Sequence, residues 1–110
     1  MRHAVISGAA RGIGRGLAEG FLADGYRVTG VDLGGGTITA DGYDHAILDV
    51  RDDAAVKAFG ARLDTLDVLV NAAGVKSGRE YDTDAFADVI DINLTGTMRL
   101  CTACHGALAA

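Results

Sequence analysis

The sequence predicts an α/β fold in which helices cover both faces of a parallel sheet. Short apolar runs that suit buried strands alternate with segments whose apolar residues recur at helical spacing. The chain has 110 residues, the size of one small domain. Its hydrophobic content of 49% and charged content of 23% are typical of a globular protein. Because strand–helix–strand units connect right-handedly, the sheet is expected to be doubly wound.

The first half of the chain predicts three strands and two helices. A strand at His3–Ser7 leads through a glycine turn into a helix that ends near residues 24–25, where Gly25 suits the stop. The apolar stripe expected on this helix consists of Ile13, Leu17, Phe21 and Leu22. The other elements are strands at 26–31 and 44–48, a glycine-rich loop at 34–36, and a helix at 52–63 with Val56, Phe59 and Leu63 buried.

The second half predicts a fourth strand and two more helices. The strand covers 67–70 and closes in a turn at Asn71–Gly74, and helices at 82–91 and 95–110 are separated near Asn93. Four parallel strands in the order 3-2-1-4 make an incomplete doubly wound sheet. The outer edge of the fourth strand is expected to be open, apolar and prone to pairing with another strand.

A glycine turn joins the first strand to the first helix. Gly8, Gly12 and Gly14 follow the spacing Gly-x-x-x-Gly-x-Gly, which differs from the commoner Gly-x-Gly-x-x-Gly fingerprint. Glycines let the backbone approach a ligand closely, and a helix start offers free N–H groups and a positive dipole end to phosphates. The turn predicts a cradle for a dinucleotide pyrophosphate, and a tight turn that binds nothing is the alternative.

An acidic residue follows the second predicted strand. Asp32 lies about 20 residues beyond the glycine turn, where a carboxylate accepts hydrogen bonds from an adenosine ribose. A carboxylate there repels a 2′-phosphate and favours NAD over NADP. Arg11 favours NADP instead, because a basic side chain in the turn can pair with the charge of a phosphate. A solvated loop aspartate is the alternative interpretation of Asp32.

Five segments, in this order and spacing, resemble the conserved signposts of the short-chain dehydrogenases/reductases. They are Ser7–Gly14, Asp32, Asp49–Val50, Asn71–Gly74 and Ile92–Gly96. The resemblance covers the whole chain, and Ser7 stands where the family usually has threonine. It implies a Rossmann-type fold and an NAD(P)-dependent oxidoreductase that converts alcohols and ketones by hydride transfer.

The resemblance also implies a role for each matching residue. The residues implied to shape or contact the pyrophosphate site are Gly8, Arg11, Gly12, Ile13 and Gly14. Those implied to hold adenosine are Asp32 and Leu33 at the ribose, and the Asp49 side chain and the Val50 N–H at the adenine edge. Those implied to stabilise the sheet and wall the cleft are Asn71, Ala72, Ala73 and Gly74.

Of the family's four catalytic residues, Asn93 alone has a counterpart. It is similar to the asparagine that interrupts a helix in this family, where its backbone carbonyl holds a water on the proton-relay path. The family also uses a serine and a Tyr-x-x-x-Lys pair, in which tyrosine is the general acid/base and lysine lowers its pKa. The residues four positions after Tyr26, Tyr43 and Tyr81 are Gly30, Ile47 and Ala85. We therefore expect residues 1–110 to be a cofactor-binding domain that is catalytically inactive alone.

Composition and motifs argue against several other functions. The net charge of -5 argues against nucleic acid and anionic membranes as partners. No apolar stretch approaches the roughly 20 residues of a membrane span, and no signal peptide is recognisable, so a cytoplasmic location is expected. Cys101-x-x-Cys104-His105 has haem-attachment spacing, but we expect two small buried side chains and a surface histidine. No metal site is predicted, and Lys76 is expected to be a solvated loop lysine.

Three functional interpretations remain open at this point. The first is the NAD-binding part of a short-chain oxidoreductase, which acts on a small alcohol or carbonyl substrate once the missing half is supplied. The second is a non-catalytic dinucleotide-binding module, and the third is a degenerate chain without function. A homo-oligomer or a complementing segment is the expected partner. The helix residues expected to serve self-association are Leu100, Ala103, Ala107 and Leu108.

Overall fold

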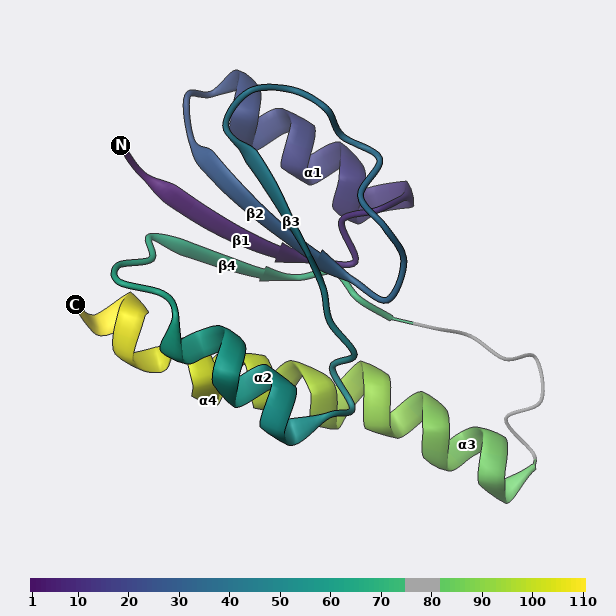
Figure 1. Cartoon of the computed structure of the whole chain (residues 1–110). Coiled ribbons are helices and arrows are strands. Elements are labelled where there is room, and N and C mark those ends of the chain that lie inside the picture. The colour runs from purple at the N-terminus through teal and green to yellow at the C-terminus, as the bar shows by residue number, and fades with distance from the viewer. Residues whose placement is uncertain (75–81) are drawn as a thin grey trace.

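A computed structural model describes residues 1–74 and 82–110, so the expectations for Lys76 and Tyr81 lie outside the described residues. Strands and helices alternate as predicted (Figure 1), and the predicted boundaries differ from the observed ones by one or two residues in most elements. The elements are β1 (His3–Ser7), α1 (Gly12–Ala23), β2 (Arg27–Asp32), β3 (Tyr43–Ile47), α2 (Asp53–Ala61), β4 (Val68–Asn71), α3 (Thr83–Ile90), a π-helical turn η1 (Asp91–Thr95) and α4 (Gly96–Ala109).

The four strands form one parallel sheet in the order β3-β2-β1-β4, which confirms the predicted incomplete Rossmann-type sheet. The register pairs Ser7 with Val31 on one side and with Asn71 on the other, so the carboxyl ends of β1, β2 and β4 meet at one edge. All five residues of β1 are buried, because this strand lies between neighbours and under helices. All four residues of the edge strand β4 are half-buried.

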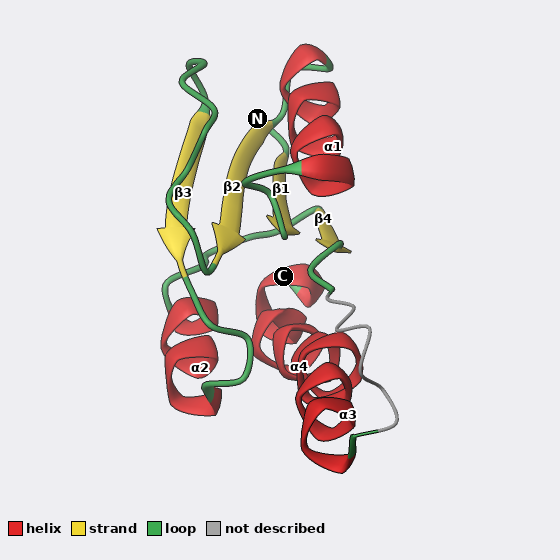
Figure 2. Cartoon of the chain, turned by 90° about the vertical axis from the view of Figure 1, so that its right-hand side faces the viewer, coloured by secondary structure: helices red, strands yellow, loops and turns green. Residues whose placement is uncertain are grey.

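Helices cover both faces of the sheet. Figures 1 and 2 show α1 on one side and α2 with α4 on the other. A small core under α1 is built from Ala4, Ile6, Ala9, Ala18 and Val28. A larger core lies under α2 and α4, and its members include Val5, Val31, Val56, Phe59, Leu100 and Cys104. The alternation of β1 side chains between these two cores is what a doubly wound sheet requires.

The buried stripe predicted on α1 is partly wrong. The helix buries Gly14 and Ala18, with Phe21 and Leu22 packed against the core beside them, whereas Ile13 and Leu17 are 81% and 38% exposed. Small residues occupy the buried side of α1 because the helix begins against the backbone that follows β1, where a larger side chain has no room. Ile13 is thereby turned out of the core.

Two expectations for α4 also require correction. Leu100 and Ala107 are buried within the chain's own core and Ala103 packs against it, so these residues do not form a free association face. Leu108, the fourth residue expected to serve self-association, is 39% exposed. Cys104 is buried as expected, and burial raises the pKa of its thiol to about 11, but Cys101 is exposed. The reason is helical geometry, because Leu100, Cys104 and Ala107 form the buried stripe at helical spacing, whereas Cys101 follows Leu100 directly and falls outside that stripe.

The predicted separation of the last two helices near Asn93 is a π-helical turn rather than a break. Backbone angles stay helical from Ile90 to Gly96, and the Gly96 N–H donates to the carbonyl of Asp91, five residues earlier. Single π-helical turns inside α-helices are rare and are frequent at functional sites. It also joins α3 to α4 as one bent helix (Figure 1).

A buried histidine links three strands at the edge of the sheet remote from their carboxyl ends. His3 Nε2 lies 2.8 Å from Thr29 Oγ1, and Arg27 Nη2 donates to His3 Nδ1 at 3.1 Å. The backbone N–H of His3 donates to Asp67 Oδ2 at 2.8 Å. An acceptor at Nδ1 requires the neutral imidazole, and burial, followed by the charge of Arg27, lowers the pKa of His3 from 6.5.

We predict that stability falls as the pH drops below about 6.5. Because the pKa is lower in the folded state, the unfolded chain binds the proton first. The stabilising contribution is therefore present above pH 6.5 and is lost as pH falls through the folded-state pKa. Urea unfolding between pH 7.5 and 5 measures this, and His3→Gln should flatten the dependence. An unchanged slope in His3→Gln would contradict the assignment.

Candidate functional site

A cleft of about 590 Å³ opens at the carboxyl edge of the sheet, where the ends of β1, β2 and β4 meet the first turn of α1. Ligands of doubly wound sheets bind at this edge, where the strand order reverses, here between β1 and β4. The cleft is lined by Gly8, Ala10, Arg11, Gly12, Ile13, Gly14, Val31, Asp32, Leu33, Gly34, Leu48, Asp49, Val50, Ala72, Ala73, Gly74 and Ile92.

Three glycines shape the floor of the cleft, each for a different steric reason. Gly8 has φ +69°, and a Cβ there would come within 2.8 Å of the Ala72 carbonyl oxygen. A Cβ at Gly14 would overlap the Gly8 carbonyl. Gly12 has φ +60°, but a Cβ there would meet nothing within 4 Å. Gly8 and Gly14 therefore allow tight packing of backbone on backbone, and Gly12 keeps space open beside the cleft.

The N-terminus of α1 carries no side-chain cap, unlike the starts of α2 and α3. The carboxylate of Asp52 caps α2 by accepting from the Ala55 N–H, and that of Asp82 caps α3 by accepting from Ala85. In α1 the cap position is Arg11, which makes no capping hydrogen bond. The first N–H groups of this helix thus face the cleft without a protein carboxylate, in the arrangement that suits a bound anion.

The carboxylate of Asp32 lies at the end of β2 and is held by two backbone N–H groups. The Ala10 N–H donates to Oδ2 at 3.0 Å, and the Gly34 N–H donates to Oδ1 at 3.2 Å. An ionised carboxylate has about four acceptor sites, so each oxygen keeps capacity for a further donor. The first contact also fixes the glycine turn against β2, and Asp32 therefore shapes the cleft as well as lining it.

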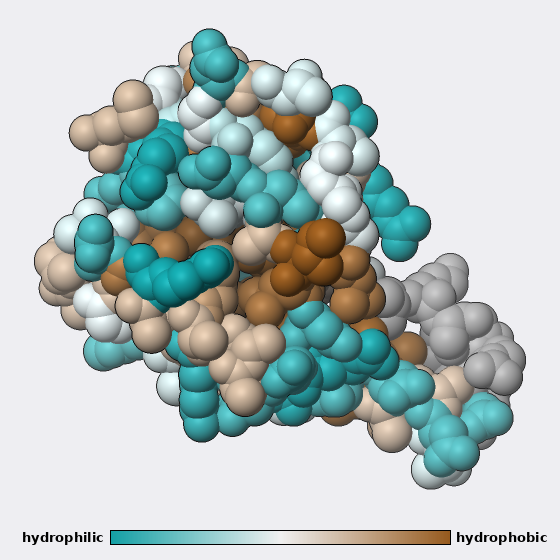
Figure 3. Space-filling model, viewed as in Figure 1, coloured by the Kyte–Doolittle hydropathy of each residue, from teal (hydrophilic) through white to brown (hydrophobic). Residues whose placement is uncertain are grey.

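Apolar side chains stand at the mouth of the cleft. Ile13 and Leu33, 81% and 55% exposed, both line it. Hydrophobic surface also gathers near the end of β3 in Figure 3, and Ile47, the last residue of that strand, is 72% exposed. A pocket that combines apolar walls with a few polar groups is the usual form of a small-molecule site.

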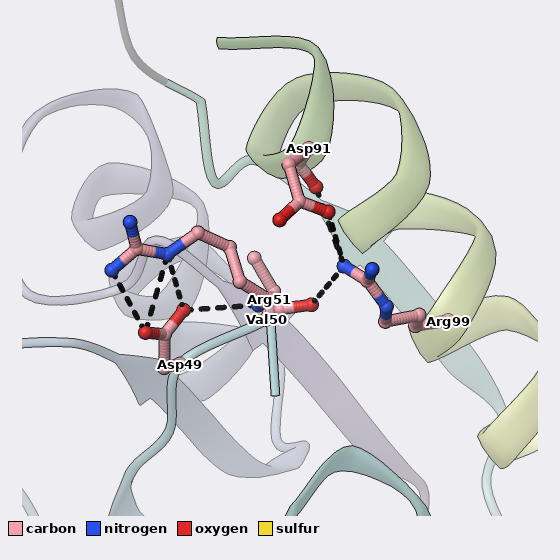
Figure 4. Close-up of polar contacts among 5 residues, drawn as sticks. All are labelled: Asp49, Val50, Arg51, Asp91 and Arg99. Atoms are coloured by element: carbon pink, nitrogen blue, oxygen red, sulfur yellow. Dashed lines mark hydrogen bonds and ion pairs between the residues drawn. The ribbon is translucent and has the colours of Figure 1, made fainter. Parts of the chain in front are cut away.

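Asp49 is oriented by a two-pronged ion pair. Arg51 Nη2 donates to Oδ2 at 2.9 Å and Nε donates to Oδ1 at 3.0 Å, and the Arg51 N–H also donates to Oδ1. These hydrogen bonds to Arg51 are the main cause of the lowered pKa of Asp49, so the carboxylate stays ionised at neutral pH. In Figure 4 this pair lies on the opposite side of Val50 from Arg99 and Asp91.

A second arginine ties the adjacent residue to the π-helical turn. Arg99 Nη1 donates to the Val50 carbonyl at 3.0 Å and pairs with Asp91 Oδ1 at 2.8 Å (Figure 4). The Val50 side chain packs against Gly96, where a Cβ would come within 2.7 Å of it. The segment after β3 is thus fixed to the α3–α4 junction, and Val50 lines the cleft from a rigid position.

The turn after β4 closes the opposite wall. The Ala73 N–H donates to the buried Ser7 hydroxyl at 3.0 Å, which joins the ends of β1 and β4. Asn71 Nδ2 donates to Cys101 Sγ at 3.5 Å, whereas its buried Oδ1 has no hydrogen-bond partner among the residues that the structure describes. The Ser7 hydroxyl therefore has a structural role, which the hydroxyl of a threonine would also fill.

Asn93, the predicted catalytic residue, lies in the π-helical turn on the Gly74 side of the cleft. A Cβ at Gly74 would lie 3.4 Å from Asn93 Oδ1, so the two are neighbours. The carbonyl oxygen of Asn93 accepts a hydrogen bond from Thr97 Oγ1 at 3.2 Å. The water predicted to bind the Asn93 carbonyl would therefore share this acceptor with the Thr97 hydroxyl. Ile92, next to it, lines the cleft itself.

The structure brings most of the predicted cofactor residues together. Twelve of the thirteen line one cleft, and Asn71, the last residue of β4, is the one that does not.

Sequence reasoning missed several residues that shape this site. Ala10 and Gly34 hold the Asp32 carboxylate through their N–H groups, and Arg99 anchors Val50. Because Ala10 and Gly34 act through backbone N–H groups, their side chains give no indication of this role in the sequence. Arg99 and Asp91 are eight residues apart, beyond the three or four at which helical side chains usually pair, so no local pattern indicates their ion pair.

The sheet order and the glycine turn at its carboxyl edge define a Rossmann-type α/β domain. A model of the short chain dehydrogenase family matches residues 2–109. The chain is 36% identical to a 2-dehydro-3-deoxy-L-rhamnonate dehydrogenase (NAD(+)) of Sphingomonas sp. and 35% identical to a galactitol 2-dehydrogenase of Agrobacterium fabrum. These matches cover 86% and 97% of this chain, but 43% and 47% of those proteins. The chain belongs to the short-chain dehydrogenase family of oxidoreductases, and it spans less than half the length of these relatives.

Solved structures give the same result. The ligand-free aldohexose dehydrogenase of Thermoplasma acidophilum has a TM-score of 0.89 at 27% identity, over 97% of this chain and 44% of that one. A short-chain dehydrogenase of Leptospira borgpetersenii with bound NAD+ has a TM-score of 0.85 at 22% identity, over 94% of this chain and 44% of that one, a likeness of fold alone. No helix in the described part of the chain is long and apolar enough to cross a membrane.

Proposed function

We propose that this chain is the cofactor-binding part of an NAD-dependent short-chain oxidoreductase and that its cleft holds the ADP-ribose half of the dinucleotide. The observation that carries the proposal is the uncapped start of α1 beside the open space at Gly12. An anion seated there meets unpaired N–H groups and the positive end of the helix dipole. The bound nicotinamide would supply hydride transfer, and the residues of this chain would bind and orient it.

The adenosine side is assigned to the residues after β2 and β3. Asp32 keeps acceptor capacity on both carboxylate oxygens, which suits the hydroxyl groups of a ribose. Asp49, held by Arg51, and Val50, held through its carbonyl by Arg99, are proposed to meet the adenine edge. The charge of Asp32 favours NAD, because a 2′-phosphate beside it would be repelled. Arg11, in the turn, is left to serve the diphosphate.

Catalysis is proposed to need a further segment that supplies the serine and the Tyr-x-x-x-Lys pair. Among the described residues, β4 pairs only with β1, so its other edge is unpaired. Asn71, at the end of that edge strand, has a buried side-chain oxygen without a described partner. Both features fit a fifth strand that adds to β4, supplied by the same product or by another chain. The substrate would be a small alcohol or carbonyl compound, and the chain alone is expected to be inactive.

Calorimetric titration of the 110-residue chain with NAD, NADP and FAD tests the proposal. NAD should bind, and more tightly than NADP. Absence of binding by every cofactor at millimolar concentration, with a folded sample, would overturn it. A non-catalytic binding module is separated from an oxidoreductase by assaying alcohols and ketones after the downstream segment is added.

Two glycine substitutions give a matched test of the pyrophosphate site. Gly12 and Gly25 both have positive φ, and a Cβ at either meets nothing within 4 Å, but only Gly12 lines the cleft. Gly12→Ala and Gly25→Ala should therefore lose similar stability, roughly 1 kcal/mol of backbone strain each. Gly12→Ala alone should weaken NAD binding, by about tenfold. Equal NAD affinity in the two variants would count against the site.

A further inference from the structure

A chain of hydrogen bonds runs from β3 to the carboxylate at the end of β2. Tyr43 O–H lies 2.7 Å from His45 Nδ1, and His45 Nε2 lies 2.8 Å from the Gly34 carbonyl oxygen. The carbonyl can only accept, so Nε2 carries the proton and Nδ1 accepts from the phenol. The same Gly34 residue donates its N–H to Asp32 Oδ1 at 3.2 Å.

We propose that His45, with Tyr43 behind it, is a positioning residue that fixes the Gly34 residue and thereby aims the Asp32 carboxylate into the cleft. The inference rests on the proposed function, since it assigns His45 to the ribose subsite of that cleft. His45 itself does not line the cleft. It acts through Gly34, which does.

Two glycines leave the space that this arrangement needs. A Cβ at Gly30, in β2, would overlap the Tyr43 hydroxyl, and a Cβ at Gly36 would lie 2.8 Å from His45 Cγ. Tyr43 and His45 are two residues apart on β3, so their side chains share one face of the sheet. Burial, with the nearby charge of Asp32, raises the pKa of Tyr43, which therefore remains a neutral donor.

The loop is also tied to the glycine turn from its other end. Thr37 Oγ1 donates to the Ala10 carbonyl at 2.7 Å, and the Ala10 N–H donates to Asp32 Oδ2 at 3.0 Å. Asp32 is therefore held by the N–H groups of Gly34 and Ala10, two residues whose carbonyl groups are bound by His45 and Thr37. Without His45, the Gly34 carbonyl in this three-glycine loop loses its only described side-chain contact.

A double-mutant cycle separates this role from a structural one. ADP-ribose binding is measured for wild type, His45→Leu, Asp32→Asn and the double variant. His45→Leu should weaken binding about fivefold in the wild-type background and have little effect in the Asp32→Asn background. His45→Gln, which keeps an N–H donor, should bind within about twofold of wild type. His105→Leu, which removes an exposed imidazole at the far end of α4, is the control.

Three results would overturn the inference. They are equal losses in both Asp32 backgrounds, no loss in His45→Leu, and no rescue by His45→Gln. If His45→Leu does not fold, Tyr43→Phe replaces it, with a smaller loss of about twofold expected because one hydrogen bond is removed. Failure of wild type to bind ADP-ribose would instead refute the proposed function, so the two failures are distinguishable.

Discussion

Gly14→Ala should destabilise the chain by about 3 kcal/mol or more. The added Cβ would overlap the carbonyl of Gly8, and this contact joins backbone to backbone, so neither side can yield by rotating a side chain. The first turn of α1 would have to move away from β1, with the loss of buried contacts at Ala18. Urea unfolding measures the change in free energy.

Gly16→Ala is the matched control. Gly16 lies in the same helix, is exposed, and has nothing within 4 Å of the position of an added Cβ. Alanine favours a helix by up to about 1 kcal/mol over glycine, so Gly16→Ala should be neutral or stabilising. Similar stability of the two variants would show that α1 does not pack on the glycine turn as described.

Asp32→Asn should weaken NAD binding by about ten- to a hundredfold and reduce the preference for NAD over NADP. The amide has one acceptor oxygen, so it keeps one of the two backbone N–H hydrogen bonds and loses the other. The fold is expected to survive this loss, which costs about 1 kcal/mol. It loses the charge that attracts ribose hydroxyls and repels a 2′-phosphate. Calorimetric titration of both cofactors measures the affinities and their ratio.

Asp44→Asn controls for the change in net charge, because Asp44 is an exposed carboxylate on β3 that does not line the cleft. It should leave both affinities unchanged. An undiminished NAD preference in Asp32→Asn would assign cofactor selection to another residue.

The topology and most of the cleft could be predicted from the sequence, because local patterns decide both. Strand–helix alternation specifies a parallel doubly wound sheet, and strands of such a sheet end at one edge. The segments after those strands, such as Asp49–Val50 and Asn71–Gly74, were therefore expected to converge.

Features that depend on tertiary packing could not be predicted. Apolar periodicity placed Ile13 in the core, but the close approach of Gly14 to Gly8 gives the buried side of α1 to small residues. The residues expected for self-association, Leu100 and Ala107, are used by the chain's own core. The link from His45 to Gly34 depends on how a glycine-rich loop folds back, which no local pattern specifies.

The most direct test is to follow backbone amide resonances of the 110-residue chain during titration with ADP-ribose. The account predicts the largest changes at Gly12, Ile13 and Gly14, whose N–H groups begin α1, and a second group at Gly34 and Val50. A second cavity lies between α2 and α4, where Lys57, Gly60 and Thr102 are among the lining residues. Binding that leaves the α1 amides unmoved, or changes centred on that second cavity, would contradict the account.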